Sequence, residues 1–508
     1  IRETAGSAPG PSINWALSGQ ASADSSGSGD PAASAIDGDA GTNWCPDSWT
    51  GTLTVDLGQL RALDGLGITL AAASPSASAT IELAATPGGW HPLPAARLIA
   101  LDPGNPMYLP VPGGTRARFA RLTVKSGTGA PVCVGELRAF GPDPAAARLD
   151  LGADLSFTPQ ELAAGASFTD RGRPGSPVTI LRANGASFVR MRLWVNPPPG
   201  YSNLASDLSL ARAVSAAGMK IYLDIMYSDF WADPQHQDIP AAWQGQDLSQ
   251  LAVTVRSYSQ QVISAFANQG TPVDLVSIGN EIRNGMLWPA GQVDPSTGAG
   301  YDNLATLLKA GVAGVRAGNP PGHRLQVMMH YDQGGDNKLS QAFFRALTSR
   351  GVPFDVIGLS YYPFFHGTIS QLRANLDALA GQFRKPIVIA ETQYPWTLAN
   401  GDSTGNFVWQ PSQVSAGYPA SPGGQLSFVS DELSILAQVP DGLGQGLFYW
   451  EPEWIPGVGW EPGAGTPNDN LTLFDFQGRA LPSIGYMSNP AGVCQGYDPW
   501  DVPCVIGS

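Results

Sequence analysis

Two glutamates each follow a short apolar run, and they are the residues in this sequence best suited to chemistry. Glu281 ends the segment Val276-Ser-Ile-Gly-Asn-Glu281, and Glu391 ends Pro386-Ile-Val-Ile-Ala-Glu391, 110 positions later. A short apolar run that stops at polar residues is typical of a buried parallel strand, which delivers the following side chains to one edge of a sheet. Two carboxyl groups at such an edge are the minimum equipment for cleaving a glycosidic bond.

The elements that must carry these residues alternate along the second part of the chain, over residues 149–490. Helix-like patterns at 207–214 and 251–266 are followed by Gly218 and Gly270, as expected at helix C-termini. Repeated strand and helix units predict a closed (β/α)₈ barrel. A doubly wound sheet is the alternative, but no Gly-x-Gly-x-x-Gly opens the first unit. The eight strand candidates are residues 149–155, 188–193, 220–225, 274–278, 325–330, 356–360, 387–390 and 446–450.

The C-terminal ends of these predicted strands carry a consistent set of polar and aromatic residues. In a (β/α)₈ barrel all of them would meet at one mouth, where this fold does its chemistry. A ring of aromatic residues beside two carboxylates is typical of a saccharide cleft, whereas one or two alone would indicate core packing. Besides the two glutamates, the set comprises Arg190, Asp224, Trp231, Asn280, Trp288, His330, Tyr362 and Trp450, whereas Trp454 and Trp460 could equally be loop packing.

The composition describes a large, acidic protein with enough apolar residues to build more than one core. The 508 residues carry a formal net charge of −14, 43% are hydrophobic, and 14 are Trp. The length predicts two or more domains. The negative charge, without any basic cluster, argues against nucleic acid as a partner. No apolar run reaches the ~18 residues that a membrane span requires.

Four cysteines allow three pairings, and sequence position favours Cys45–Cys133 and Cys494–Cys504 because each pair then stays local. No Cys or His spacing indicates zinc. Residue 1 is Ile rather than Met, so we expect a leader to have been removed and the protein to be secreted.

The first part of the chain shows short alternating strands separated by Gly, Pro and Asp turns, at residues 53–57, 68–70, 80–83, 119–124 and 136–140. This pattern predicts an antiparallel β-sandwich over residues 1–141, with a Pro/Ala linker at 142–148 and a C-terminal tail at 491–508. Ala35-Ile-Asp-Gly-Asp-Ala-Gly-Thr-Asn-Trp44, Val55-Asp-Leu-Gly58 and Glu136-Leu-Arg-Ala-Phe-Gly141 resemble the discoidin (factor 5/8 type C) module. The resemblance implies a jelly-roll sandwich that is often a carbohydrate-binding module. A purely structural appendage is the alternative.

The second part resembles a known enzyme family over residues 151–486. The motifs are Val189-Arg-Met-Arg-Leu-Trp-Val-Asn-Pro197, Tyr227-Ser-Asp-Phe-Trp-Ala-Asp-Pro234, Ser277-Ile-Gly-Asn-Glu-Ile-Arg-Asn-Gly285, Ser360-Tyr-Tyr-Pro-Phe364 and Phe448-Tyr-Trp-Glu-Pro452. They are similar to those of the arabinogalactan endo-β-1,4-galactanases, glycoside hydrolase family 53. The resemblance implies a retaining glycosidase with its acid/base at Glu281 and its nucleophile at Glu391, and no cofactor for catalysis. It places Arg190, Asn280, Tyr362 and Trp450 around the sugar at the cleavage point.

Two residues depart from the pattern of that family. Met226 stands where the family usually has His, and Gln393 follows the nucleophile where relatives have other residues. These departures keep a rival open, a clan relative with another galactan linkage or an exo mode of action. A non-catalytic galactan-binding protein is a rival of a different class, which the presence of both glutamates disfavours. We expect a polysaccharide substrate, no membrane partner and a monomer.

A metal site is predicted on Thr397-Leu-Ala-Asn-Gly-Asp-Ser-Thr-Gly-Asn406, which resembles a calcium-binding loop of bacterial relatives. Oxygen-bearing residues alternate in this loop, a spacing that suits a hard cation. The expected ligands are Asn400, Asp402, Thr404, Asn406, Thr466 and Asp469. A structural Ca²⁺ would fasten two loops beside the cleft, and an ordinary Asn/Gly/Asp turn is the alternative.

Overall fold

The computed structural model of the protein describes residues 12–93, 99–101, 103–143, 148–197, 200–460 and 463–487. The predicted tail at 491–508, with Cys494 and Cys504, lies outside the described residues, as does most of the predicted linker. The predicted domain boundaries stay predictions.

The N-terminal part is a sandwich of two antiparallel sheets. One sheet has the order β1-β10-β4-β8, and the other has β2-β3-β9-β5-β6 with β7 paired to β5. The strands alternate buried and solvent-facing residues, as the sequence predicts. Their bounds are β1 Ser12–Asn14, β2 Gln20–Ala23, β3 Thr50–Ala62, β4 Gly65–Leu70, β5 Ala77–Ala84, β6 His91–Pro92, β7 Ile99–Leu101, β8 Met107–Pro110, β9 Arg116–Ser126 and β10 Val134–Pro142.

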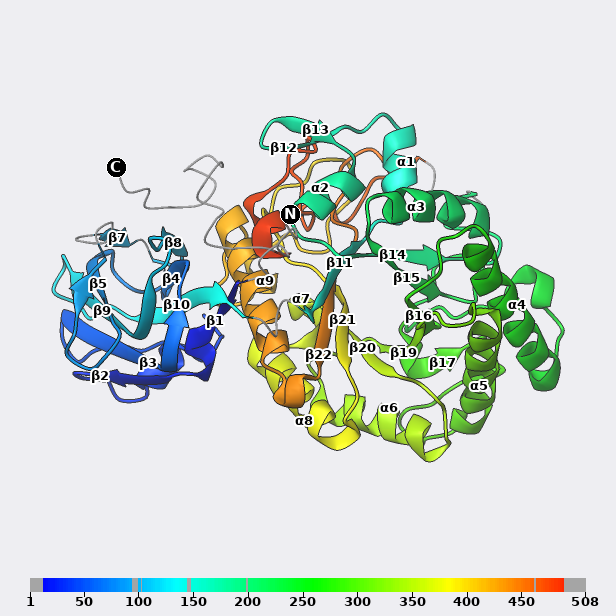
Figure 1. Ribbon diagram of the computed structural model, residues 1–508, viewed down its shortest axis with the longest axis horizontal. Helices are drawn as coiled ribbons and strands as arrows, with labels where there is room; N and C mark the ends of the chain where they lie inside the picture. The colour runs from blue at the N-terminus through cyan, green and yellow to red at the C-terminus, as the bar shows by residue number, and fades with distance from the viewer. Residues whose placement is uncertain are drawn as a thin grey trace, which may run out of the picture.

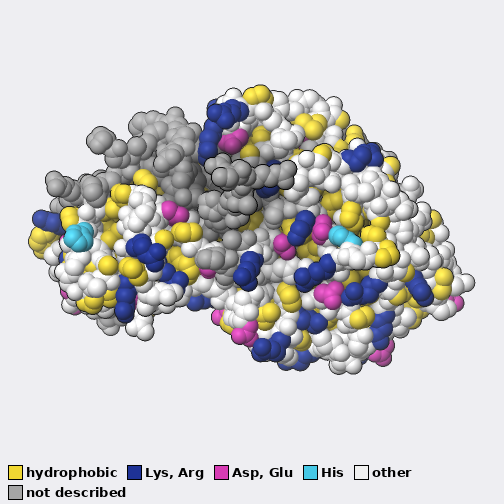
Figure 2. Space-filling model, viewed as in Figure 1, with side chains coloured by type: hydrophobic (Ala, Val, Ile, Leu, Met, Phe, Trp, Pro, Cys, Tyr) yellow, Lys and Arg dark blue, Asp and Glu magenta, His cyan; other side chains and the backbone are white. Residues whose placement is uncertain are grey.

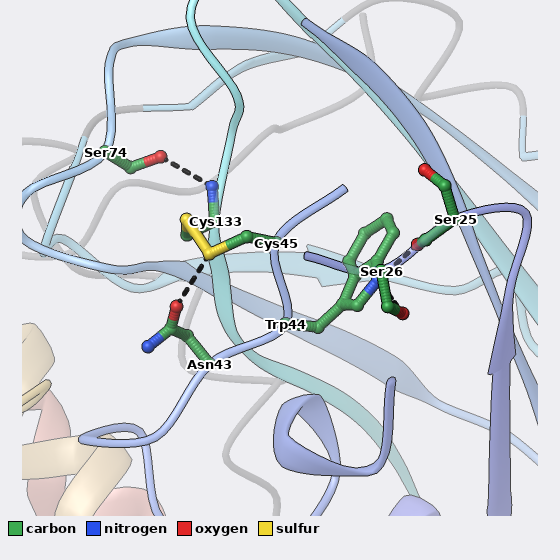
Figure 3. Close-up of a disulfide and its surroundings, with 7 residues drawn as sticks. All are labelled: Ser25, Ser26, Asn43, Trp44, Cys45, Ser74 and Cys133. Atoms are coloured by element: carbon green, nitrogen blue, oxygen red, sulfur yellow. Dashed lines mark hydrogen bonds between the residues drawn. A yellow bond between two sulfur atoms is a disulfide. The ribbon is translucent and has the colours of Figure 1, made fainter. Parts of the chain in front are cut away.

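A disulfide joins Cys45 to Cys133, 88 residues apart, and confirms the first predicted pairing (Figure 3). Beside it, the backbone N–H of Cys133 donates to Ser74 Oγ at 2.8 Å. The neighbouring Trp44 is fully buried and donates from its indole N–H to the carbonyl of Ser25 at 2.9 Å. The bond therefore ties the loop before β3 to the start of β10. Disulfides of this kind persist in oxidising compartments.

The second part is a closed barrel of eight parallel strands in chain order, within the described residues (Figure 1). The prediction of a (β/α)₈ barrel is confirmed, and each observed strand overlaps its predicted segment. The strands are β11 Asp150–Asp154, β14 Phe188–Leu193, β15 Lys220–Ile225, β16 Leu275–Ile278, β19 Gln326–Tyr331, β20 Val356–Tyr361, β21 Ile387–Thr392 and β22 Gly444–Tyr449. Trp450, expected as the last residue of its strand, directly follows β22.

The barrel interior is apolar in its lower layer and charged at its mouth. A separate buried cluster fills the lower layer with one or two residues from most strands: Phe188, Tyr222, Leu275, Met328, Val356, Val388, Ala390 and Phe448. Side chains two positions further along a strand point the same way. On β14 and β15 these positions hold Arg190 and Asp224, so the alternation carries two charged groups to the C-terminal mouth.

Helices surround the barrel, and several begin at caps that the sequence supplies. Asn203 caps α3, Asp247 caps α4 and Thr368 caps α8, each with a reciprocal bond from the third helical residue. These caps explain why α3 and α4 begin three residues before the predicted segments. The helices are α1 Thr158–Ala163, α2 Pro177–Ala183, α3 Leu204–Ala216, α4 Leu248–Asn268, α5 Tyr301–Gly318, α6 Asn337–Ser349, α7 Pro363–His366, α8 Ile369–Phe383 and α9 Pro422–Ala437.

Helix α9 lies between the sandwich and the barrel strands (Figure 1). Every residue from 423 to 436 is buried, although the helix contains Asp431 and Glu432. On the face shown in Figure 2, acidic and basic side chains are interspersed over both parts of the molecule. None of the described helices has the combined length and apolar character needed to span a bilayer.

Candidate active site

Glu281 and Glu391 meet at the mouth of the barrel. Glu391 is the penultimate residue of β21, and Glu281 follows β16 by three residues. One carboxylate oxygen of each lies within 4.8 Å of the other and of a ring nitrogen of His330. Glu281 has a backbone φ of 47°, which is uncommon for a residue with a side chain and is found most often at functional sites. The structure thus brings together the two glutamates that the sequence singles out.

Glu391 is held by hydrogen-bond donors from the neighbouring strand β20 and from β14, which is not adjacent to β21 in the barrel. Arg190 Nη2 lies 2.6 Å from Glu391 Oε1. The hydroxyl of Tyr362 donates to Glu391 Oε2 at 2.8 Å. The second oxygen also lies 3.4 Å from the hydroxyl of Ser360, which stands opposite Glu391 in the β20–β21 register. These contacts fix both oxygens of Glu391.

Arg190 is fully buried and stands at the centre of an ionic network beneath Glu391. Its guanidinium donates to Asp154 and Asp224, each at 2.7 Å. The same group donates to Asn280 Oδ1 at 3.0 Å, so the residue before Glu281 is fixed as well. A buried guanidinium with several acceptors stays charged. Arg190 therefore supplies a permanent positive charge beside Glu391.

The two glutamates have different electrostatic surroundings. Burial raises the pKa of Glu281 well above its ordinary value, and the charge of Glu391 raises it further. Burial also raises the pKa of Glu391, but Arg190 and the Tyr362 hydroxyl lower it. Two interacting carboxyl groups titrate as a pair, and a shared proton resides where the anion is less stabilised. That group is Glu281, which leaves Glu391 ionised.

His330 is a buried neutral group beside this pair. Burial, followed by the charge of Arg190, holds its pKa well below the ordinary value. Its Nε2 lies 2.8 Å from the Ser360 hydroxyl, which in turn faces Glu391. A neutral imidazole can exchange hydrogen bonds with the serine without adding charge. His330 and Asp224, both predicted to contact substrate, lie behind the side chains that line the cleft.

A cleft of about 470 Å³ lies over the two glutamates. Trp231, Trp450 and Trp460 form an aromatic wall, with ring centres 4.4 Å apart for Trp231 and Trp460 and 6.3 Å apart for Trp231 and Trp450. Met226 and Gln393, the two departures from the family pattern, both line this cleft. A second hollow of about 680 Å³ continues past Trp231 and Trp460. The groove therefore runs beyond Glu281 and Glu391.

Trp288 is a predicted stacking residue that does not line this cleft. Its indole N–H donates to the carbonyl of Asn284 at 2.8 Å, and its backbone N–H donates to that of Gln237 at 2.7 Å. A part for Trp288 in sugar binding stays a prediction.

Several cleft residues were not predicted to contact substrate, although Asp332 and Phe364 lie close behind the ends of predicted strands. Arg283 and Asp332 form an ion pair at 3.2 Å next to Glu281. The other lining residues not predicted to contact substrate include Asp233, His236, Gln333, Phe364, Phe365, His366, Phe407 and Asn468. Asp154 could have been found, because it stands near the end of the first predicted strand.

The predicted calcium ligands come from two loops that lie side by side. Asp402 accepts from the backbone N–H of Thr404 at 2.6 Å and of Thr466 at 2.8 Å. Asp469 accepts from Gly401 N–H at 2.7 Å and from the Asn406 amide at 2.9 Å. The remaining oxygen of Asn406, Oδ1, is buried without a donor. Two carboxylates and an unpartnered amide oxygen form a donor set that suits a hard cation. Calcium binding stays a prediction.

Comparison with known proteins gives two family matches. Residues 150–487 match the model described as glycosyl hydrolase family 53. Residues 18–136 match the F5/8 type C domain.

Relatives and solved structures agree with the first match. The chain is 38% identical over 312 residues to a probable arabinogalactan endo-β-1,4-galactanase A of Aspergillus fumigatus, covering 60% of this chain and 84% of that protein. It is 34% identical over 340 residues to an arabinogalactan endo-β-1,4-galactanase of Thermothelomyces thermophilus, covering 66% and 97%. A GH53 catalytic domain of Ignisphaera aggregans superposes with a TM-score of 0.64 at 34% identity, covering 68% of this chain and 96% of that one.

Proposed function

This chain belongs to glycosyl hydrolase family 53, and we propose that it cleaves β-1,4-galactosidic bonds inside galactan chains with net retention of configuration. One observation carries the proposal: carboxylate oxygens of Glu281 and Glu391 lie within 4.8 Å of each other. Retaining glycosidases hold their carboxyl groups roughly 5–5.5 Å apart, whereas inverting enzymes need roughly 6.5–9.5 Å to admit a water. The galactanases among its relatives support the substrate.

Glu391 is the nucleophile in this mechanism. Its contacts with Arg190 and Tyr362 favour the carboxylate form and fix the carboxylate at the cleft. Attack on the anomeric carbon breaks the glycosidic bond and forms a galactosyl ester on Glu391. The ester removes the negative charge of Glu391.

Glu281 is the acid and then the base. With its pKa raised, Glu281 enters the reaction protonated and gives its proton to the departing oxygen. Once Glu391 is esterified, the field that held the proton on Glu281 is gone, and its pKa falls. The carboxylate can then take a proton from water, whose oxygen attacks the anomeric carbon, breaks its bond to Glu391 and restores the free carboxylate. The product keeps the β configuration because two inversions cancel.

The shape of the groove supports cleavage within the chain. The cleft and the second hollow share Trp231, Asp233, His236 and Trp460, so a polymer can lie across the catalytic pair and extend past it. An exo-acting enzyme requires one closed end. Aromatic rings along the groove offer faces on which sugars stack.

A clan relative of shifted specificity is the second candidate, because Met226 and Gln393 line the cleft. Incubation with β-1,4-galactan, β-1,3-galactan and an aryl β-galactoside, followed by chromatography, separates the candidates. Our proposal predicts galacto-oligosaccharides of several lengths from β-1,4-galactan and little release from the other two. Galactose as the sole early product would contradict the endo mode, and release from β-1,3-galactan alone would contradict the linkage.

We also propose that the protein acts outside the cell. The proposed substrate is a polysaccharide, which an enzyme encounters outside the cell. The Cys45–Cys133 disulfide suits an oxidising compartment. Thiol labelling of the protein from cells and from the medium, with and without a reductant, would show where it accumulates and whether Cys45 and Cys133 are bonded there; protein found only inside cells with free thiols would contradict the proposal.

A further inference from the structure

We propose that the N-terminal β-sandwich is a positioning part of the active site, which acts through α9 on the strand that carries Glu391. The proposal rests on the proposed function only for its kinetic test. It assigns to the sandwich a part in the cleavage reaction itself, separate from any binding of carbohydrate.

The sandwich covers one side of α9, and the barrel covers the other. Asn14 donates from its backbone N–H to Ser434 Oγ at 3.0 Å, and the hydroxyls of Tyr108 and Ser427 lie 2.8 Å apart. With residues 423–436 all buried, the helix has no face left for solvent. A helix that is buried all round belongs to a core. The two parts of the molecule therefore share one core along α9.

A buried ion pair crosses this boundary. Arg138 Nη2 lies 2.6 Å from Asp431 Oδ2, and both side chains are fully buried. A second nitrogen of Arg138 donates to Asp431 Oδ1 at 2.8 Å, and a third donates to Thr69 at 2.8 Å. Such a bidentate pair fixes direction as well as distance. Removing one partner leaves a buried charge without compensation, which is strongly unfavourable.

The neighbouring residue on α9 contacts the strand of the nucleophile. Glu432, buried beside Asp431, accepts from the Thr392 hydroxyl at 2.8 Å. Thr392 directly follows Glu391 at the end of β21. Two adjacent residues of one helix thus reach the sandwich on one side and the catalytic strand on the other.

A second route runs from the same ion pair through Tyr418. Its hydroxyl donates to Asp431 Oδ2 at 3.0 Å and accepts from the backbone N–H of Ala40 at 3.3 Å. The carbonyl of Tyr418 accepts from the Tyr394 hydroxyl at 2.6 Å. Tyr394 stands three residues after Glu391, and its ring stacks on Phe428 of α9 at 4.3 Å. The loop that leaves the nucleophile is thereby held against the sandwich.

The segment around Ala40 in the sandwich also packs directly against the loop that contains Tyr418. A Cβ at Gly417 would lie 1.9 Å from the carbonyl of Ala40, and Gly417 has a φ of 78°, so only glycine fits. On α8, Ser370 donates to Asp39 at 2.8 Å, and Arg373 donates to the carbonyl of Asp37 at 3.1 Å. These contacts lie at the end of the barrel where the catalytic residues are.

The kinetic test uses a short soluble substrate, β-1,4-galactotetraose, and the full-length chain. Arg138→Ala removes the crossing ion pair. Arg121→Ala is the matched control, because Arg121 pairs with Glu82 at 2.6 Å on the same sandwich, where both side chains are partly exposed. We expect kcat to fall about fivefold to tenfold in Arg138→Ala, in the range of measured coupling between sites, and to stay unchanged in the control. A module that only captures polymer would leave kcat on the tetrasaccharide unaltered.

Tyr418→Phe keeps the Arg138–Asp431 ion pair and removes only the hydroxyl that bridges Asp431 and Ala40. This variant replaces Arg138→Ala in the kinetic test if Arg138→Ala fails to fold. It should lower kcat on the tetrasaccharide in the same direction. Wild-type kcat in both variants, each shown to be folded by circular dichroism, would overturn the proposal.

Calorimetry tests the shared core without any substrate, and so separates this proposal from the galactan assignment. The wild type should unfold in one transition for both parts, and Arg138→Ala should separate that transition or lower its midpoint. Two independent transitions in the wild type would overturn the proposal even if galactan is cleaved. Arg121→Ala should unfold as the wild type does.

Discussion

Arg190 contacts one oxygen of Glu391 at 2.6 Å while the Tyr362 hydroxyl contacts the other at 2.8 Å. This relationship makes two chemically equal carboxyl groups different. Glu391 has a fixed cation and a hydroxyl donor, whereas burial and the charge of Glu391 raise the pKa of Glu281. The assignment of nucleophile and acid follows from that asymmetry.

Replacing Arg190 should shift the acid limb of the activity profile. Arg190 lowers the pKa of Glu391, so its removal in Arg190→Met raises that pKa, and a higher pH is then needed to ionise the nucleophile. We expect kcat/KM to fall by about 100-fold or more, as for other lost electrostatic contacts at reacting centres, with the acid limb moved to higher pH. Arg190→Lys keeps the charge and should move the limb less. An unmoved limb in Arg190→Met would contradict the role of Arg190.

The role of Glu281 can be tested through the leaving group. Glu281→Ala removes the proton donor, which a poor leaving group needs and an activated one does not. We expect activity on galactan to fall by about 100-fold or more, within the usual range for general acid catalysis. Formation of the glycosyl-enzyme from an aryl glycoside of a β-1,4-galacto-oligosaccharide with a good leaving group should fall far less. Equal losses on both substrates would argue against an acid role.

A second pair of buried acids should make stability depend on pH. Burial raises the pKa of Glu161 to about 9, to which the charge of Glu453 contributes, and burial raises the pKa of Glu453 to about 8. Because the folded pKa is the higher one, this contribution to stability is complete below the unfolded pKa of about 4.3 and is lost as pH rises through 8 to 9. Melting temperature should therefore fall from about pH 4 up to about pH 9, by about 1 °C for each kcal/mol lost in a chain of this length.

The matched variants for this effect are Glu161→Gln and Glu82→Gln. Glu161→Gln cannot ionise and should flatten the fall between pH 7 and pH 9, as measured by calorimetry in a buffer series. Glu82→Gln alters an ion pair that is partly exposed and should keep the wild-type slope. The same slope in all three proteins would show that Glu161 is already ionised in the folded protein over this pH range, and would contradict the raised pKa.

Calcium should stabilise the two loops beside the cleft, as we propose from the oxygen set of Asp402, Asp469 and Asn406. Adding CaCl₂ to chelator-treated protein should raise the melting temperature, and Asp469→Asn should lose most of that rise. Ca²⁺ should leave the cleavage stereochemistry unchanged, because its role is structural. An equal melting temperature with chelator and with millimolar Ca²⁺ would contradict the proposal.

The sequence predicts the barrel and its catalytic pair because both depend on local patterns. Short apolar runs before Glu281 and Glu391 mark buried strands, and the closed parallel topology brings strand ends together. The predicted disulfide between Cys45 and Cys133 was likewise found. The strands can be predicted from one segment at a time, and the meeting of the two glutamates follows from the rule that parallel strand ends gather at one mouth of a barrel.

Other features depend on contacts that no local pattern encodes. Arg138 and Asp431 are 293 residues apart, and nothing near either residue indicates an ion pair between domains. The same limit applies to the ion pair between Arg283 and Asp332, which joins segments that follow two different strands. Trp460 lines the cleft and Trp288 does not. Both lie on loops, and the sequence does not indicate the direction in which a side chain on a loop points.

The stereochemistry of the first product tests the central claim most directly. Proton NMR of β-1,4-galactan in the first minutes of digestion, before mutarotation, reports the configuration of the new reducing end. The close approach of Glu281 and Glu391, with Glu391 as nucleophile, predicts the β anomer first and the α anomer only later. The α anomer first would mean that water attacks directly, and it would contradict the assignment of Glu391 as the nucleophile.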